Sequence, residues 1–210
     1  MAINNKGVLL IVSGFAGSGK GTLMKAITDK YDNYALSISA TTRSPRPGEE
    51  DGREYFFKTK EEFEAMIEAG ELLEHACYVG NYYGTPKPYV DKMLEAGKDV
   101  ILEIEIQGAL QVKEKCPDAL LIFVMPPNVE EIYNRLKKRN TETEEVIRKR
   151  MERGSQEALE ISKYDYLMIN DDINECMERL HQVVQSTKLS VNRNLEFLED
   201  VKVQFDKFLG

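Results

Sequence analysis

The segment from Gly14 to Thr22 reads Gly-Phe-Ala-Gly-Ser-Gly-Lys-Gly-Thr. An apolar segment, Val8 to Val12, precedes it, and a segment of helix-forming composition, Leu23 to Ile27, follows it. This order predicts a buried strand, a glycine-rich turn and a helix start, the context in which backbone N–H groups cradle a polyphosphate. The alternative is a glycine-rich turn with a surface lysine, but motif and context agree. The sequence therefore predicts a nucleoside triphosphate site.

The glycine-rich segment also carries the side chains expected to contact phosphate and metal. Its glycines, at positions 14, 17, 19 and 21, are expected to allow positive φ and close backbone approach. Lys20 is placed to reach the β- and γ-phosphates, and a following hydroxyl can hold Mg²⁺. The strict pattern puts that hydroxyl directly after the lysine, where Gly21 stands, so Thr22 is the candidate here.

Bulk composition excludes several function classes. The chain has 210 residues and a net charge of −8, without a basic patch for nucleic acid. No apolar run approaches a membrane span, and the three separated cysteines are typical of reduced thiols, so we expect a cytoplasmic protein. His75 and Cys77 have no second pair at metal-ligand spacing and are expected to be ordinary side chains. The oligomeric state stays open.

Strands and helices alternate along most of the chain. This pattern predicts an α/β fold, with a parallel sheet covered by helices on both faces. A mostly-β insert interrupts it, with a helix capped by Thr59 and Glu62. Further helices are expected after Pro127, from a Thr141–Glu144 cap to about residue 162, and from Asp172 onward. The expected strands are 8–12, 34–38, 99–106, 120–125 and 166–169. We expect a core of 1–35, 91–125 and 163–187, an insert of 36–90, a helical segment of 126–162 and a tail of 188–210. The tail could be a packing helix or a contact for a second subunit, and we favour an ordinary terminal helix.

The expected strand at 99–106 carries two carboxylates. Alternation places Glu103 and Glu105 on one face of it. Central parallel strands are normally apolar on both faces, and ligands of open α/β sheets bind beyond their carboxyl ends. We favour carboxylates that face a nucleotide and metal site, and the alternative is an edge strand with a wet face.

Arginines occur on separate segments. Arg43 and Arg46 lie on a proline-stiffened loop, while Arg135 and Arg139 are four residues apart on one helix face. Arginine suits phosphate because its planar fork donates two hydrogen bonds and keeps its charge. Two arginine sets plus Lys20 fit phosphoryl transfer between two phosphorylated molecules. On the next helix, Arg150 is included as a candidate, whereas Arg148 and Arg153 are expected to be surface residues.

These features together resemble the guanylate kinase family, over about residues 7–185. The resemblance implies a P-loop three-layer fold with a GMP-binding insert (36–90) and a lid (126–162). It also implies transfer of the ATP γ-phosphoryl group to GMP with Mg²⁺. The segments that carry it are Ser37 to Glu49, Gly52 to Tyr55, Gly80 to Thr85, Arg139 to Glu144 and Asn170 to Asp172.

The resemblance also implies roles for single residues. Arg43, Arg46, Tyr55 and Tyr83 would hold the GMP phosphate. Glu74 would accept hydrogen bonds from the guanine edge, with Ser39, Thr85 and Glu105 completing the pocket; adenine, with an acceptor at N1, would be rejected by roughly 10⁴-fold or more. The ATP side would comprise Gly14, Phe15, Ala16, Gly17, Ser18, Gly19, Lys20, Gly21, Thr22, Arg135 and Asn170, with Lys20, Arg43, Arg135, Arg139 and Arg150 catalytic, and with Thr22 and Glu103 as metal candidates, directly or through water.

Some positions depart from the family pattern. Phe15 and Ala16 replace a common Pro and Ser, which we expect to be harmless because backbone N–H groups make the contact. Glu105 stands where Asp is usual and is one methylene longer. The rival functions are a kinase of a phosphorylated sugar and a non-catalytic scaffold that binds protein partners. The set of Glu74, Tyr83 and Thr85 disfavours the first, and Lys20 with the lid arginines disfavours the second.

Overall fold

The computed structural model describes residues 4–138 and 143–210. Its larger sheet has five strands in the order β2 (Tyr34–Leu36), β7 (Asp99–Glu103), β1 (Leu9–Gly14), β8 (Leu120–Met125) and β9 (Tyr166–Ile169). Every pairing in this sheet is parallel, which confirms the predicted parallel α/β architecture. β1 lies at the centre, so the glycine-rich segment that follows it leaves the middle of the sheet at its carboxyl end.

Helices cover both faces of the large sheet because β1 alternates between two cores. Val8, Leu10 and Val12 pack with α1 (Lys20–Lys30) and α7 (Ile173–Lys188). Leu9 and Ile11 belong to the opposite core, which includes residues of α3 (Lys87–Glu95) and α4 (Ile106–Lys115). A strand that is apolar on both faces is what a doubly covered parallel sheet requires.

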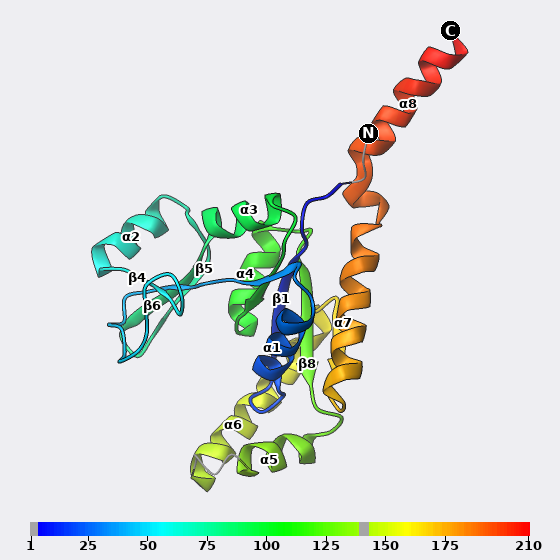
Figure 1. Cartoon of the computed structure of the whole chain (residues 1–210). Coiled ribbons are helices and arrows are strands. Elements are labelled where there is room, and N and C mark those ends of the chain that lie inside the picture. The colour runs from blue at the N-terminus through cyan, green and yellow to red at the C-terminus, as the bar shows by residue number, and fades with distance from the viewer. Residues whose placement is uncertain (1–3, 139–142) are drawn as a thin grey trace.

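A second, four-stranded sheet stands beside the large one (Figure 1). Its strands are β3 (Ala40–Thr41), β4 (Phe56–Phe57), β5 (Leu72–Tyr78) and β6 (Asn81–Pro86), in the order β4-β3-β6-β5. Helix α2 (Lys60–Glu68) covers it and begins with the predicted capping box, in which the Thr59 side chain accepts from the Glu62 N–H and the Glu62 side chain accepts from the Thr59 N–H. The small sheet therefore forms the mostly-β insert expected from the sequence.

Two helices lie beyond the carboxyl end of the large sheet, near the start of α1 (Figure 1). These are α5 (Val129–Lys138) and α6 (Glu144–Glu157), the second continued by a 3-10 turn, η1 (Ala158–Lys163). Helix α6 takes Thr143 as its N-cap, whose hydroxyl accepts from the Val146 N–H. The predicted cap, Thr141, lies outside the described residues.

Other sequence predictions are corrected by the structure. Helix α3 was not predicted, although Pro88 is compatible with its first turn and Val90 and Leu94 bury one face. Strand β7 ends at Glu103, and Glu105 is the N-cap residue of α4, so the two carboxylates do not share a strand. The edge-strand alternative is also wrong, because β7 pairs with β2 and β1.

The C-terminal segment forms a helix but does not pack on the body. A short 3-10 turn, η2 (Val191–Asn194), leads into α8 (Leu195–Leu209), which projects away from both sheets (Figure 1). No residue of α8 is buried, and the Phe208 side chain is 87% exposed. The tail is therefore helical, but it is not the packed terminal helix that we favoured.

Candidate functional site

The glycine-rich turn is held in a conformation that only glycine fits at two positions. A Cβ atom on Gly14 would lie 2.0 Å from the Val124 carbonyl oxygen, because β1 and β8 are adjacent there. Gly19 has φ 84° as the N-cap residue of α1, and a Cβ atom there would lie 2.5 Å from Asn170 Nδ2. Gly21 lies inside α1 and is not among the residues with positive φ, so that expectation was wrong.

Lys20 lies back across the turn that precedes it. Its Nζ donates to the carbonyl oxygens of Gly14, at 2.6 Å, and Phe15, at 3.2 Å. Ser18 adds a buried hydroxyl whose Oγ has no hydrogen-bond partner among the described residues. A buried polar atom without a protein partner is unusual, so this hydroxyl is able to hydrogen-bond a ligand. The turn thus presents an ammonium group, a hydroxyl and the amino-terminal end of α1 together, a combination suited to an anion.

A cavity of about 500 Å³ lies beside the turn. Arg135 donates from Nη2 to the Asn170 carbonyl oxygen, at 3.0 Å, and from Nε to Glu131 Oε1, at 2.7 Å. The Asn170 side chain, buried in turn, donates to the Ser18 carbonyl oxygen at 2.8 Å. The predicted ATP-side residues Gly17, Gly19, Thr22, Arg135 and Asn170 all line this cavity, together with Lys138, Asp171, Asp172 and Ile173.

Arg150, another predicted lid arginine, does not line that cavity. Arg150 lies exposed on α6. Arg139 lies outside the described residues. Arg148 is exposed and pairs with Glu152 on its own helix, as expected of a surface residue.

Three of the four residues predicted to hold the GMP phosphate cluster on the small sheet. The Arg43 guanidinium lies 5.3 Å from the centre of the Tyr55 ring, and the Tyr55 and Tyr83 rings are 6.1 Å apart. Arg43 Nη2 contacts both carboxylate oxygens of Glu49, at 3.0 and 2.9 Å, and this hydrogen bonding raises the pKa of Arg43. Arg46 is exposed at the edge of the cluster. A fixed cation flanked by two phenols is a suitable phosphate site.

Glu74 lies buried next to this cluster. Tyr83 and Thr85 are two residues apart on β6 and share a face, and the Thr85 hydroxyl donates to Glu74 Oε1 at 2.8 Å. Burial raises the pKa of Glu74, and the Thr85 hydrogen bond opposes that rise. A Cβ atom on Gly108 of α4 would lie 3.2 Å from Glu74 Oε2, so the carboxylate sits where the small sheet meets the large one. Ser39 precedes β3 and is half-buried.

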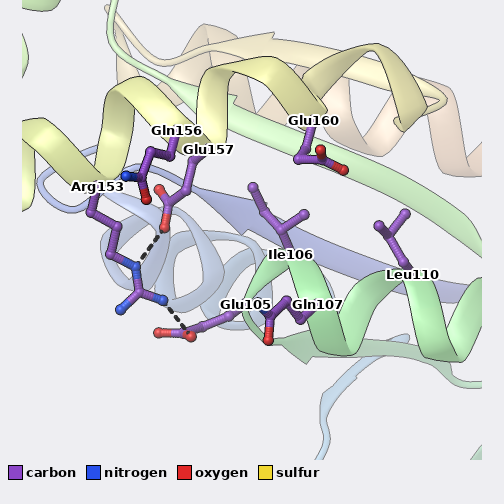
Figure 2. A pocket seen from close by; sticks show the side chains of 8 residues that line it. All are labelled: Glu105, Ile106, Gln107, Leu110, Arg153, Gln156, Glu157 and Glu160. Carbon is purple, nitrogen blue, oxygen red and sulfur yellow. Dashed lines mark hydrogen bonds and ion pairs between the residues drawn. The ribbon is translucent and has the colours of Figure 1, made fainter.

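The two carboxylates beyond β7 have separate surroundings. Glu103 is exposed at the end of β7, level with Val12 of β1. Glu105 Oε2 accepts from Arg153 Nη2 at 2.6 Å (Figure 2). Arg153 is exposed, as expected of a surface residue, but its side chain also leaves α6 to reach Glu105, a contact that the sequence did not indicate.

Within residues 4–138 and 143–210, no three His, Cys, Asp or Glu side chains gather as a metal cluster. Mg²⁺ commonly binds through one or two protein groups plus substrate phosphates, so Thr22 and Glu103 remain suitable candidates. Over the same ranges, none of the helices has the length and apolar character needed to cross a bilayer.

Comparison with known proteins places this geometry in a family. The sequence model described as Guanylate kinase matches residues 6–187. The guanylate kinase of Caldanaerobacter subterraneus subsp. tengcongensis is 51% identical over 92% of this chain and 94% of its own length. That of Lactococcus lactis is 46% identical over 96% of this chain and 100% of its own length.

The chain belongs to the guanylate kinase family. A solved structure agrees with this: the guanylate kinase from Anaplasma phagocytophilum is 30% identical, with a TM-score of 0.72 over 95% of this chain and 96% of that one. The resemblance drawn from the sequence motifs is thereby confirmed, as is the P-loop α/β fold.

Sequence reasoning missed one feature of this guanylate kinase family member in the glycine-rich turn itself. Phe15, treated only as a carrier of a backbone N–H, is 6% exposed and packs edge-to-face on Phe123, with ring centres 5.0 Å apart. A Cβ atom on Gly154 of α6 would lie 3.4 Å from the Phe15 ring. Phe15 therefore joins the turn to α6. The sequence did contain a signal for this packing, because an aromatic residue inside a glycine-rich turn is expected to bury its ring against a neighbouring element.

Glu49 is the second missed residue. It accepts from Arg43, as described, and from the Arg46 N–H at 2.8 Å. The pKa of Glu49 is lowered, and the hydrogen bond from the Arg46 backbone is the largest cause. The hydrogen bond from the Arg43 side chain lowers it further. Its place in the Ser37 to Glu49 segment was visible in the sequence, but only the fold shows that it orients an arginine.

Proposed function

We propose that the protein is an ATP:GMP phosphotransferase that makes GDP and ADP. The observation that carries this proposal is the buried Glu74–Thr85 pair beside the Arg43, Tyr55 and Tyr83 cluster, on the same small sheet. A carboxylate can accept from guanine N1–H and the N2 amine, whereas adenine would face it with an acceptor. Family membership and the Lys20 turn support the same reaction.

The GMP phosphate would lie between Arg43, Arg46, Tyr55 and Tyr83. Arg43 is already fixed by Glu49, so little side-chain freedom remains to be lost when the phosphate binds. The base would reach Glu74 and Thr85, with Ser39 and Glu105 at the pocket edge. We assign residues 36–90 to this GMP-binding segment.

The ATP phosphates would occupy the turn from Gly14 to Thr22, with Lys20 turning from its own loop carbonyls to the β- and γ-phosphates. Asn170 and Arg135 line the adjacent cavity and would contact the rest of the nucleotide. Mg²⁺, held by Thr22 and Glu103 directly or through water, would neutralise phosphate charge. We assign residues 1–35, 91–125 and 163–187 to the core, 126–162 to the lid and 188–210 to the tail.

Transfer would be direct and in line. An oxygen of the GMP phosphate forms a bond to the γ-phosphorus as the bond from that phosphorus to the β–γ bridging oxygen breaks, and ADP leaves. The acceptor is already nucleophilic, so the protein supplies positioning, charge and exclusion of water. Lys20, Arg43, Arg135, Arg139 and Arg150 would share the charge of the transferred group.

Turnover measured by coupled ADP release tests the proposal. ATP with GMP should give rapid turnover, and ATP with AMP, CMP or UMP should give little. Preference for AMP would refute the base-pocket argument. Tight binding of a protein partner without ATP-dependent turnover of GMP would favour the scaffold function instead.

A further inference from the structure

One arginine of α6 reaches across to the start of α4 (Figure 2). Arg153 Nη2 donates to Glu105 Oε2 at 2.6 Å, and its Nε donates to Glu157 Oε1 at 3.0 Å. Glu157 lies one helical turn away on α6, with its side chain only 20% exposed. The guanidinium is therefore oriented by its own helix while it contacts a residue of another element.

The bridge spans one end of a cavity of about 420 Å³ between α4 and the α6–η1 segment. Ile106 and Leu110 give this cavity apolar walls on the α4 side, and Gln156, Glu157 and Glu160 line it from the other. Arg153 thus connects α4 and α6 where open space lies between the two helices.

Glu105 needs such a partner because its side chain is long and 76% exposed. A free glutamate of this kind samples many rotamers, and fixing one on ligand binding costs free energy. Arg153 engages Oε2, while Oε1 makes no hydrogen bond to any residue that the structure describes. One carboxylate oxygen is held, and the other stays available as an acceptor.

We propose that Arg153 is a positioning residue for guanine recognition, which fixes the Glu105 carboxylate and couples α6 to GMP binding. This inference rests on the proposed function, in which Glu105 completes the guanine pocket. Since α6 also carries Arg150, the position of that helix and the orientation of Glu105 become linked through a single side chain.

The test compares Arg153→Ala with Arg148→Ala by steady-state kinetics in ATP and GMP. Arg148 is a matched control because it lies on the same helix and pairs within it, with Glu152 at 3.0 Å. Arg153→Ala should raise KM for GMP about threefold, the scale of a partly exposed ion pair, with kcat and KM for ATP nearly unchanged. Arg148→Ala should leave all three constants unchanged. Arg153→Lys keeps the charge without the planar fork and should fall between parent and Ala variant.

The Glu105→Ala background separates positioning from a general effect on α6. There, adding Arg153→Ala should change KM for GMP no further, since the group being positioned is gone. Two results would overturn the inference: an equal rise in KM for GMP when Arg153→Ala is added to Glu105→Ala, or equal kinetics of Arg153→Ala and Arg148→Ala. In either case, GMP turnover by the parent would still uphold the proposed function. A parent protein without GMP turnover would overturn both. If the Ala variant is unstable, Arg153→Lys alone must show the raised KM for GMP.

Discussion

Lys20 and Glu74 contribute opposite charges to the two ends of the proposed transfer. Lys20 lies on the carbonyl oxygens of its own loop, and Glu74 lies buried against Thr85. Neighbouring residues hold each charged group in place, and we expect substitution at either position to affect chemistry more than folding.

Replacement of Lys20 by Ala should lower kcat/KM by at least about 100-fold, because one of the donors expected to stabilise the transferred group is lost. The fold should persist, since Lys20 is not a core residue. Lys25→Ala is the matched control, because Lys25 lies exposed on the same helix and pairs with Asp29 at 2.6 Å. Turnover within about threefold of the parent after the Lys20 change would remove that residue from the mechanism.

The pH dependence of GMP binding should report on Glu74. Burial raises its pKa above the ordinary value of about 4.3. The charged form is the one that accepts from guanine, so KM for GMP should increase as pH falls through the raised pKa. In the unfolded chain the Glu74 carboxyl loses its proton at lower pH than in the folded protein. The contribution of Glu74 to the free energy of unfolding therefore decreases as pH rises from its unfolded pKa through its raised folded pKa.

Steady-state titration from pH 8 to about pH 5 checks the Glu74 prediction. Thr85→Val should move the inflection in KM for GMP to higher pH, because the hydrogen bond that favours the carboxylate is removed. An inflection that stays in place in both Thr85→Val and Glu74→Gln would assign it to another group.

At this scale the sequence identified residue types well but not their partners. Glu74, Thr85, Tyr55 and Tyr83 are brought together as the motifs indicated. Glu49 and Arg153 were missed because their contacts depend on where loops and helices meet. Arg153 in particular lies on a strongly charged helix face, where the pattern alone predicts solvated pairs along the helix.

Among the elements, α6 links the helices at the carboxyl end of the sheet to the glycine-rich turn. Gly154 faces the Phe15 ring, and Ile147 belongs to the same core cluster as Phe15 and Phe123. The packing of α6 against the turn is thus set by an aromatic side chain and a small residue opposite it.

Gly154→Ala should stabilise the protein by about 0.5–1 kcal/mol, because alanine favours the helix and its Cβ meets Phe15 at an ordinary 3.4 Å. Gly154→Leu should destabilise it, since the larger side chain must displace the ring. Urea unfolding of both variants checks this. A destabilised Ala variant would contradict the packing described for α6.

The C-terminal region offers a contrast between α8 and the turn that precedes it. The Arg193 side chain is 5% exposed, donates to the carbonyl oxygens of Lys6 and Gly7 and pairs with Asp118.

Truncation after Asn194 should change the free energy of unfolding by less than about 1 kcal/mol, because α8 buries no residue. Arg193→Ala should cost about 1–3 kcal/mol through its lost hydrogen bonds. Thermal unfolding compares them, and a larger loss on truncation would mean that α8 has contacts elsewhere.

Helix boundaries could be predicted where the sequence contained a clear capping residue. The Thr59–Glu62 capping box is as predicted, and the helix expected from Asp172 onward begins at Ile173, with Asp172 as its N-cap. Before α6 the predicted cap was Thr141, which lies outside the described residues. The structure uses Thr143, which puts Glu144 and Glu145 in the first turn, where acidic residues are favourable. For α8, the helical spacing of its apolar residues predicted a helix. Whether those residues pack against the rest of the protein depends on contacts between distant segments, which no local rule describes.

For the whole molecule, the arrangement of the two sheets determines how the proposed substrates meet. The large sheet presents the glycine-rich turn at its centre, and the small sheet carries Glu74 to a position beside α4. Periodicity and motif order predicted both parts. Their junction could not be predicted locally, because it depends on a close approach between β5 and Gly108 that joins residues far apart in the sequence.

We expect the buried Glu74 carboxylate on the small sheet to select guanine for phosphorylation at the large sheet. A competition in one vessel tests it: equal GMP and AMP with limiting ATP, products separated by chromatography, for the parent and Glu74→Gln. The parent should consume GMP, forming one GDP and one ADP per ATP, and leave AMP almost unchanged, whereas Glu74→Gln should lose most of that preference while keeping its fold. Comparable consumption of GMP and AMP by the parent, or an unchanged preference for GMP in Glu74→Gln, would contradict selection of guanine by Glu74.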